Sequence, residues 1–293
     1  MRKSFIFIFL FTTFFTLLSL TGCTIKDVEV SGEVIKKEYT EVEGKKIIIE
    51  DIATKENGKT YSPVIRFDGK PKTKSITIKA QEGFFDHLKI KEKGDTIIIS
   101  ANSRSYYLME QVYIEINGYY FNEMSFEFCE VDIDPTSCEK DFYINIDAAS
   151  VVRLVYYNGD NFTADISSAS KLTINALTAN TSNIDVSSAS TFIGTDMETS
   201  NMNINVKSAS SAKVYGGAGD LVLNCSSAST FEGSSFAADN ANVTLTGASS
   251  ALVNARETIL YKLTGASSLF IYGLAKINEE SSATGGSKAS REK

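Results

Sequence analysis

The chain has 293 residues, a formal net charge of −7 at pH 7, one histidine, four cysteines, three prolines and no tryptophan. The negative charge argues against a nucleic-acid partner, because nucleic acids are bound by basic surfaces. The length is enough for one large domain or two modest ones, and so few prolines suit regular β-structure, since proline cannot donate a hydrogen bond to a sheet.

Residues 1–22 have the organisation of an export signal. A positively charged start is followed by an apolar run that is too short and too early for a membrane span. The sequence Leu20-Thr21-Gly22-Cys23 resembles a bacterial lipobox, which implies cleavage before Cys23 and lipid attachment to it. We therefore expect an exported protein, anchored by lipid to the outer membrane at the cell surface or on the periplasmic face. An ordinary signal peptide with a chance cysteine is the alternative.

The region after the signal contains strand-like runs separated by turn sequences such as Asn57-Gly58 and Lys93-Gly94-Asp95. We expect a lead-in or edge β-region over 23–74 and the opening coils of a solenoid from residue 75. A separate β-sandwich-like domain is the alternative. Cys129 and Cys138 are close together in an exported chain, which favours a small-loop disulfide over two free thiols.

A Ser-Ala-Ser-like signature repeats through the second half at intervals of 18–20 residues. Each alanine is followed by serine and preceded by Ala, Ser or Gly. Seven matches in register indicate a structural repeat. The alanines are Ala149, Ala169, Ala189, Ala209, Ala228, Ala248 and Ala266.

Apolar residues stand three and five positions before each alanine, and the position between them is polar in every repeat. This alternation predicts a half-buried strand. An apolar column three positions after the alanine predicts a second strand, and its bulk alternates over Phe192, Ala212, Phe231 and Ala251. Large beside small on adjacent coils keeps the volume of a continuous core filled.

Strands that recur about every 20 residues without helical periodicity predict an all-β fold, a parallel β-helix or β-solenoid. We expect it over 75–278, with regular repeats over 143–275, an irregular β-region before it and a frayed or capping polar tail over 279–293. In this stack the alanine column is expected to face inward at a corner, and the serine column to stack hydroxyl groups. Cys225 stands in an apolar column and should be a buried core residue.

The corner motifs resemble those of the GIN domain, a family described as the head of autotransporter adhesins. The matching stretches are Asn183–Ser190, Val243–Ser249 and Leu260–Ser267. The resemblance covers roughly 143–275, and less of the region before it. It implies the solenoid fold, and it carries no catalytic or binding residues across to this chain.

Two carboxylates and a tyrosine-rich stretch are the candidates for chemistry. Asp165 and Asp185 share an outward column, about 5 Å apart on adjacent coils, where they could bind Ca²⁺ or act in glycoside hydrolysis, although a solvated polar ladder is the plainer interpretation. His87 has no catalytic motif around it, and we expect no cofactor. Tyrosine offers flat contact area for sugars or proteins, and the candidates are Tyr106, Tyr107, Tyr113, Tyr119, Tyr120, Tyr156 and Tyr157.

The sequence as a whole predicts a non-catalytic lipoprotein of the cell envelope that binds glycan or protein, as an adhesion module would. One alternative is a structural or periplasmic scaffold without a specific ligand. The other is a polysaccharide-processing enzyme built on a β-helix, using Asp165 and Asp185.

Overall fold

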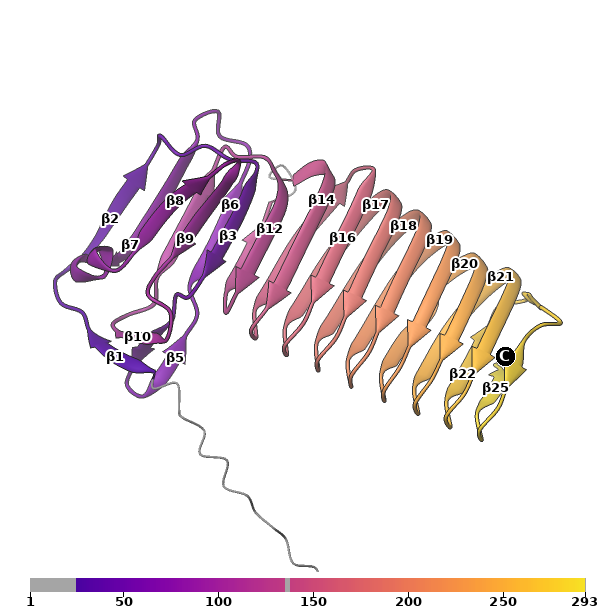
Figure 1. The fold of residues 1–293 in the computed structure, drawn as a ribbon. Coiled ribbons are helices and arrows are strands. Elements are labelled where there is room, and N and C mark those ends of the chain that lie inside the picture. Colours follow the sequence, from indigo (N-terminus) through magenta and orange to yellow (C-terminus); the bar gives the residue numbers. More distant parts are fainter. Residues whose placement is uncertain (1–24, 135–137, 293) are drawn as a thin grey trace, which may run out of the picture.

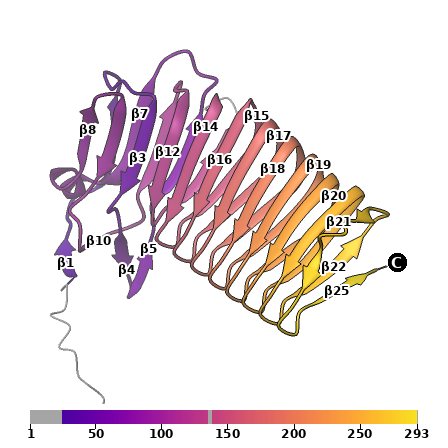
Figure 2. The same ribbon diagram turned by 45° about the vertical axis from the view of Figure 1, so that its right-hand side comes forward.

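The computed structural model describes residues 25–134 and 138–292. The expected export signal and the lipid attachment site Cys23 lie outside the described residues. The described chain is almost entirely β, and its strands stack as a solenoid of about eight turns (Figures 1 and 2). The only helix within these ranges is the short 3-10 turn η1 (Glu82–Asp86). None of the described residues forms a helix long and apolar enough to span a bilayer.

The regular coils confirm the expected fold class. Neighbouring coils pair in parallel and in the register of the sequence repeat, so that Leu172, Phe192, Ala212 and Phe231 stand in one line. The strands of this region are β14 (Cys138–Asp147), β15 (Val151–Asn158), β16 (Asn161–Ile166), β17 (Lys171–Val186), β18 (Thr191–Val206), β19 (Ser211–Cys225), β20 (Thr230–Leu245), β21 (Ser250–Leu263) and β22 (Ser268–Tyr272).

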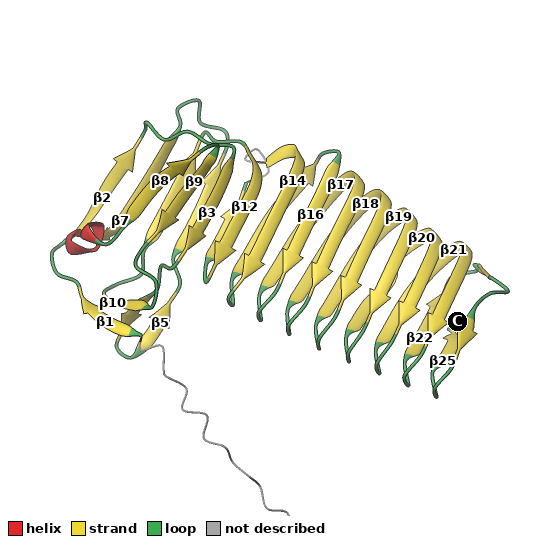
Figure 3. Cartoon of the chain, in the orientation of Figure 1, coloured by secondary structure: helices red, strands yellow, loops and turns green. Residues whose placement is uncertain are grey.

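Each regular coil has three straight segments. Along β17 buried and exposed residues alternate, but the alternation breaks at Asn175-Ala176 and again at Asn180-Thr181, where two successive residues are at least partly exposed. A strand that keeps two neighbours outward has turned a corner, because side chains otherwise alternate between faces. The third corner is the Ser-Ala-Ser signature, which is drawn as a loop at one edge of the stack (Figure 3).

The signature corner reverses the expected orientation of the alanine column. All seven alanines are exposed, whereas the serines that follow them are buried. Both central residues of the corner have left-handed backbone, with φ of 54–64° at the non-glycine positions. Positive φ at two successive residues is typical of a type I′ turn, which rotates the first two side chains outward and brings the third inward. The expectation that alanine fills the interior was therefore wrong.

The small residue before each alanine lies over the backbone of the preceding corner. A Cβ added to Gly265 would lie 2.8 Å from the amide nitrogen of Gly247, and one added to Gly247 would lie 3.0 Å from that of Ser227. Only small side chains suit a site with so little room. The tight corner-on-corner stacking explains the Ala, Ser or Gly at this position in every repeat.

The buried serines form a hydrogen-bonded ladder, as expected of stacked hydroxyl groups. The amide of Ser170 donates to Oγ of Ser190, and the amide of Ser190 donates to Oγ of Ser210, each at 3.1 Å. Oγ of Ser150 donates back across its own turn to the carbonyl of Asp147 at 2.6 Å. The ladder supplies the acceptor for the buried amide of Ser190, which would be costly to leave unpaired, and a second acceptor for the amide of Ser170, which also donates to the carbonyl of Ser167 at 3.2 Å.

The core alternates in bulk as expected, with a compensation that the sequence analysis missed. Phe192 and Phe231 are buried, and the next inward position of each coil is a glycine, Gly194 or Gly233. A Cβ on Gly233 would lie 2.5 Å from the Phe231 ring, so this ring occupies the space of the missing side chain. Cys225 is 1% exposed in its apolar column, as expected.

The opening region takes more of the chain into the solenoid than the expected boundary at residue 75. β3 pairs in parallel with β9 and β12, and β6 pairs in parallel with β11 and β13, so both are coil strands. The strands are β2 (Val34–Tyr39), β3 (Lys46–Glu50), β6 (Val64–Asp68), β7 (Ser75–Gln81), β8 (Lys89–Lys93), β9 (Thr96–Ser100), β11 (Tyr113–Asn117), β12 (Phe121–Glu127) and β13 (Glu130–Ile133).

Two structural features distinguish these opening coils from the regular coils. Antiparallel strands close the end of the stack, β2 and β7 on one flank and β8 on the other, and β2 and β8 are rich in lysine. Charged edge strands discourage pairing with another chain. Insertions at the corners form a separate small sheet of order β1 (Lys26–Glu29), β10 (Ser105–Leu108), β4 (Thr54–Glu56) and β5 (Lys59–Tyr61).

The polar tail is ordered and caps the other end. β23 (Lys276–Ile277), β24 (Ser282–Ala283) and β25 (Lys288–Arg291) pair in parallel with the last coil, and Ser287 continues the serine ladder by accepting the amide of Ser267 at 3.1 Å. Arg291 donates to the carbonyl of Gly273 at 2.6 Å and to that of Ala275 at 2.5 Å. The tail is therefore a partial coil that covers the core.

Candidate functional site

The seven candidate tyrosines do not gather on one face. Tyr107, Tyr119 and Tyr157 are at most 2% exposed and serve the core. The hydroxyl of Tyr107 accepts the amide of Asn102 at 2.9 Å, and that of Tyr119 donates to the carbonyl of Val42 at 2.7 Å. Burial raises the pKa of Tyr119 to about 12. These three side chains cannot reach a ligand in the folded chain.

Tyr113, Tyr120 and Tyr156 are exposed and remain candidates for contact. Tyr113 begins β11, on the flank that runs β11–β6–β13–β15, and its place along this flank corresponds to Val151 of β15. Tyr156 lies further along β15, at the corner where Val155 and Tyr156 are both exposed, so a corner of the coil separates it from Tyr113. Tyr120 lies apart from them, beside Lys74, Asp95 and Glu139. The fourth, Tyr106, is half-buried and belongs to a pocket described below.

Asp165 and Asp185 are register neighbours on adjacent coils, as the repeat predicts. The hydroxyl of Tyr143 donates to Asp165 at 2.7 Å, and Asn205 and Lys207 donate to Asp185 at 3.4 and 3.3 Å. Both carboxylates are thus engaged in a polar ladder along the outer surface. No group of three or more metal-ligating side chains occurs among the described residues.

The expected disulfide is not formed, because Cys129 and Cys138 are free thiols. Cys129 occupies a serine-ladder position at one end of β13, and its amide donates to Oγ of Ser150 at 3.0 Å. Cys138 follows the far end of β13. Four strand residues span about 13 Å, which is more than a disulfide can bridge. Burial raises the pKa of both thiols.

A shallow groove of about 740 Å³ crosses the coils at the corner that follows the second straight segment. Its lining is polar and comes from four successive coils, including Asp160, Asn180, Asn201 and Asp220. Asn180 donates to Asp160 at 3.3 Å, so part of this polar surface is satisfied within the protein. Amides and carboxylates at this spacing offer hydrogen bonds to a hydroxyl-rich chain such as a glycan.

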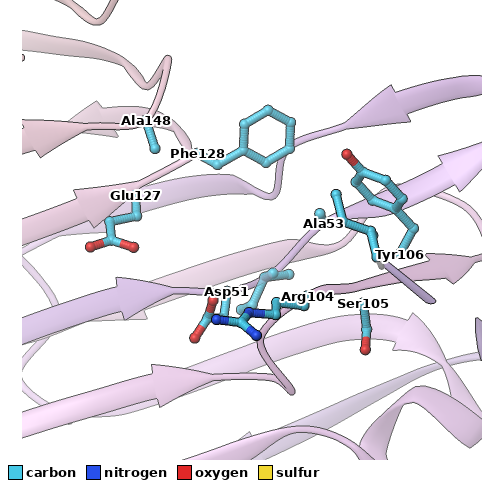
Figure 4. A pocket seen from close by; sticks show the side chains of 10 residues that line it. Asp51, Ala53, Arg104, Ser105, Tyr106, Glu127, Phe128 and Ala148 are labelled. Carbon is cyan, nitrogen blue, oxygen red and sulfur yellow. The ribbon is translucent and has the colours of Figure 1, made fainter. Parts of the chain in front are cut away.

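A smaller pocket of about 290 Å³ lies where the opening coils meet the inserted sheet (Figure 4). Asp51, Arg104 and Phe128 line it, and each is a non-glycine residue with left-handed backbone. The regular coils have only Ala, Ser or Gly at such corners, and a bulky residue such as Phe128 is strained in this backbone conformation. Glu127 and Tyr106 also line the pocket.

The carboxylates around this pocket repel one another. Burial raises the pKa of Glu127, and the nearby charges of Glu50, Asp51 and Asp147 raise it further. The sequence analysis missed this site, because its residues are far apart along the chain. A usable signal was the absence of small residues at the corners of Asp51 and Phe128.

His87 is half-buried and packs against Tyr107, with ring centroids 5.3 Å apart. The side chain of His87 therefore contributes to packing in the opening region.

Solved structures from Parabacteroides species have the same fold. Two “putative adhesin” structures, from Parabacteroides distasonis and Parabacteroides merdae, each match with a TM-score of 0.60 and 11% identity, covering 90% and 92% of this chain and 100% of theirs. A “putative lipid binding protein” from Parabacteroides distasonis matches with a TM-score of 0.54 and 14% identity, covering 92% of this chain and 100% of its own. At these identities the likeness shows the fold alone.

No curated protein matches the sequence at a significant level. A family model described as “Putative auto-transporter adhesin, head GIN domain” matches residues 68–275, which is most of the chain and includes both opening and regular coils. The resemblance seen in the corner motifs is thereby confirmed, and the chain belongs to the family of adhesin head GIN domains.

Proposed function

We propose that this chain is a non-catalytic binding module of the cell envelope, anchored through a lipid on Cys23 and carrying an adhesion surface for glycan or protein. The observation that carries the proposal is the match to an adhesin head family over 68–275. Adhesins act outside the cell, which agrees with the export signal expected over residues 1–22. The capped solenoid supports the role, because stacked coils present an extended, rigid surface.

The contact positions that we favour are Tyr113 at the start of β11 and Tyr156 at the corner within β15, both of which are exposed. Exposed tyrosine is enriched in binding surfaces because it combines a large apolar ring with a hydroxyl group. Tyr120 is a further exposed candidate. The carboxylates of Asp165 and Asp185 are engaged by neighbouring donors in an exposed ladder, which favours a binding role over glycoside hydrolysis.

The first test is protease treatment of intact cells, followed by detection of the chain. Loss of the protein from intact cells supports surface exposure, and a glycan and host-protein binding screen then follows. Protection until the outer membrane is permeabilised would contradict adhesion and favour the periplasmic scaffold. Lipid attachment is tested by labelled fatty-acid incorporation, which Cys23→Ala should abolish.

The second test addresses the tyrosines with the ligand found in that screen. Tyr113→Ala with Tyr156→Ala should weaken binding about tenfold or more, since aromatic anchors dominate binding energy. Tyr215→Ala, on β19 and away from the candidate tyrosines, is the control for loss of a tyrosine elsewhere and should leave the affinity unchanged. Unchanged affinity in the double variant would remove both tyrosines from the proposal. A Tyr119→Ala variant is unsuitable, because Tyr119 is buried and its loss would destabilise the fold.

A further inference from the structure

The pocket at the corners of the opening coils combines aromatic surface with charge. Its apolar lining includes Ile52, Phe128 and the ring of Tyr106, and its polar lining includes Asp51, Glu127 and Arg104. In the view of Figure 4 the rings of Phe128 and Tyr106 lie on one side, and the carboxylates lie on the other. A concave site with an apolar wall and a few polar groups is the usual form of a small-molecule site.

The charged side chains of this pocket are unpaired within the described part of the chain. Asp51, Glu127 and Arg104 make no ion pair and no side-chain hydrogen bond among the described residues. Elsewhere on the opening coils charged side chains do pair, as Lys46 does with Glu123 at 2.9 Å and Arg153 with Asp132 at 2.6 Å. Half-buried Glu127 thus keeps its carboxylate available to a ligand.

The balance of charge favours a cationic ligand. Two carboxylates line the pocket, and Glu50 and Asp147 add negative charge around Glu127. Arg104 is the single cation of the lining, and it is exposed to solvent. A bound cation would relieve the repulsion among the carboxylates, and aromatic faces attract cations through their ring quadrupoles.

We propose that this pocket binds a small ligand with an ammonium group on an apolar or aromatic body. The ammonium group is held by the carboxylates of Glu127 and Asp51, and the body lies against the rings of Phe128 and Tyr106. This site does not include Tyr113 or Tyr156 of the proposed adhesion function, so each proposal can fail without the other.

The test uses the full chain, purified in detergent, and three probes of similar shape: benzylamine, benzyl alcohol and benzoate. Calorimetric or NMR titration should give saturable binding of benzylamine, about tenfold tighter than that of benzyl alcohol, with benzoate the weakest. Equal affinity for the three probes, tighter binding of benzoate, or no saturable binding of benzylamine would each overturn the proposal.

Two variants locate the site. Glu127→Gln removes the charge and keeps the shape, and Phe128→Ala restores the residue found at regular corners, so both should fold. Each should weaken benzylamine binding about tenfold, by loss of the charged and aromatic contacts respectively. Asp220→Asn, a carboxylate change in the polar groove, is the matched control and should leave the affinity unchanged. Binding within twofold of the original chain in both pocket variants would overturn the assignment.

Discussion

The opening coils and the regular coils share one stacking scheme and differ at their corners. In the regular coils every signature corner has two small left-handed residues and a buried serine. In the opening coils Asp51, Arg104 and Phe128 take left-handed positions, and whole strands are inserted between coil segments. Repeated small-residue corners thus give a long uniform stack. The larger corner residues and inserted strands of the opening coils instead leave the pocket lined by Asp51, Arg104 and Phe128.

The largest effect is expected in the regular core. Phe231→Ala should lower the free energy of unfolding by about 3–5 kcal/mol, because the adjacent Ala212, Ala251 and Gly233 have no side chains able to fill the cavity. Denaturant unfolding measures the loss. Phe231→Leu, which keeps most of the volume, should lose less than Phe231→Ala. A loss below about 1 kcal/mol for Phe231→Ala would contradict the tight packing of alternating bulk.

The serine ladder offers a matched pair on one corner. Ser190→Ala should cost about 0.5–1.5 kcal/mol, because the buried amide of Ser170 loses its bond to Ser190 Oγ and keeps only the 3.2 Å bond to the carbonyl of Ser167. Ser188→Ala, two residues earlier and exposed, should change stability by less than about 0.5 kcal/mol. Equal effects of the two substitutions in thermal or chemical unfolding would refute the distinction between buried and exposed serine columns.

Cys129 shows whether a corner of the opening coils tolerates the serine found at the regular corners. Cys129 stands at a serine position, where its amide is bonded to Ser150 and its sulfur lies 3.2 Å from the carbonyl of Glu127. Cys129→Ser should be tolerated, with a loss of less than about 1 kcal/mol, since serine can donate to the same carbonyl. A severe loss in chemical unfolding would mean that this corner needs an apolar side chain.

Alkaline pH should weaken the regular coils through Cys225. Burial raises the pKa of this thiol to about 12, above its ordinary value near 9. The thiol therefore contributes stability that is fully present below pH 9 and is lost as pH rises from 9 towards 12, at up to about 1.4 kcal/mol per pH unit. Melting temperatures from pH 8 to 11 should fall less steeply in Cys225→Val. Identical slopes for the two chains would exclude this thiol as a cause.

Changes of opposite sign are expected at the corner alanines. Ala209 has φ of 58°, which is unfavourable for a residue with a Cβ. Ala209→Gly should raise the free energy of unfolding by up to about 1 kcal/mol, whereas Ala209→Val should lower it by about 1–2 kcal/mol. Thermal unfolding of both variants measures the ordering. A more stable valine variant would contradict the left-handed corner.

The repeat predicts the fold because each coil meets its neighbours in sequence register. The strand columns, the core position of Cys225 and the outward pair Asp165 and Asp185 follow from spacing alone. The inside and outside of the corner do not, because a left-handed turn breaks the two-residue alternation that sequence reasoning relies on. Ala and Ser are both small, so composition could not distinguish the exposed column from the buried one.

The opening coils were less predictable because their order in space is not their order in sequence. β3 lies between β9 and β12, so residues some 50 and 75 positions apart become neighbours. The pocket formed by Asp51, Arg104 and Glu127 depends on this arrangement. Burial of Tyr107 and Tyr119 likewise comes from inserted and capping strands that no local pattern indicates.

The two caps make the length of the molecule adjustable in whole units. Lysine-rich β2 and β8 close one end, and the tail held by Arg291 closes the other, so neither end depends on how many coils lie between them. Duplication of a gene segment encoding about 20 residues would add one coil and extend the stack by about 4.8 Å without exposing a new edge. Gain or loss of whole coils can therefore change the length of the solenoid while both caps stay the same.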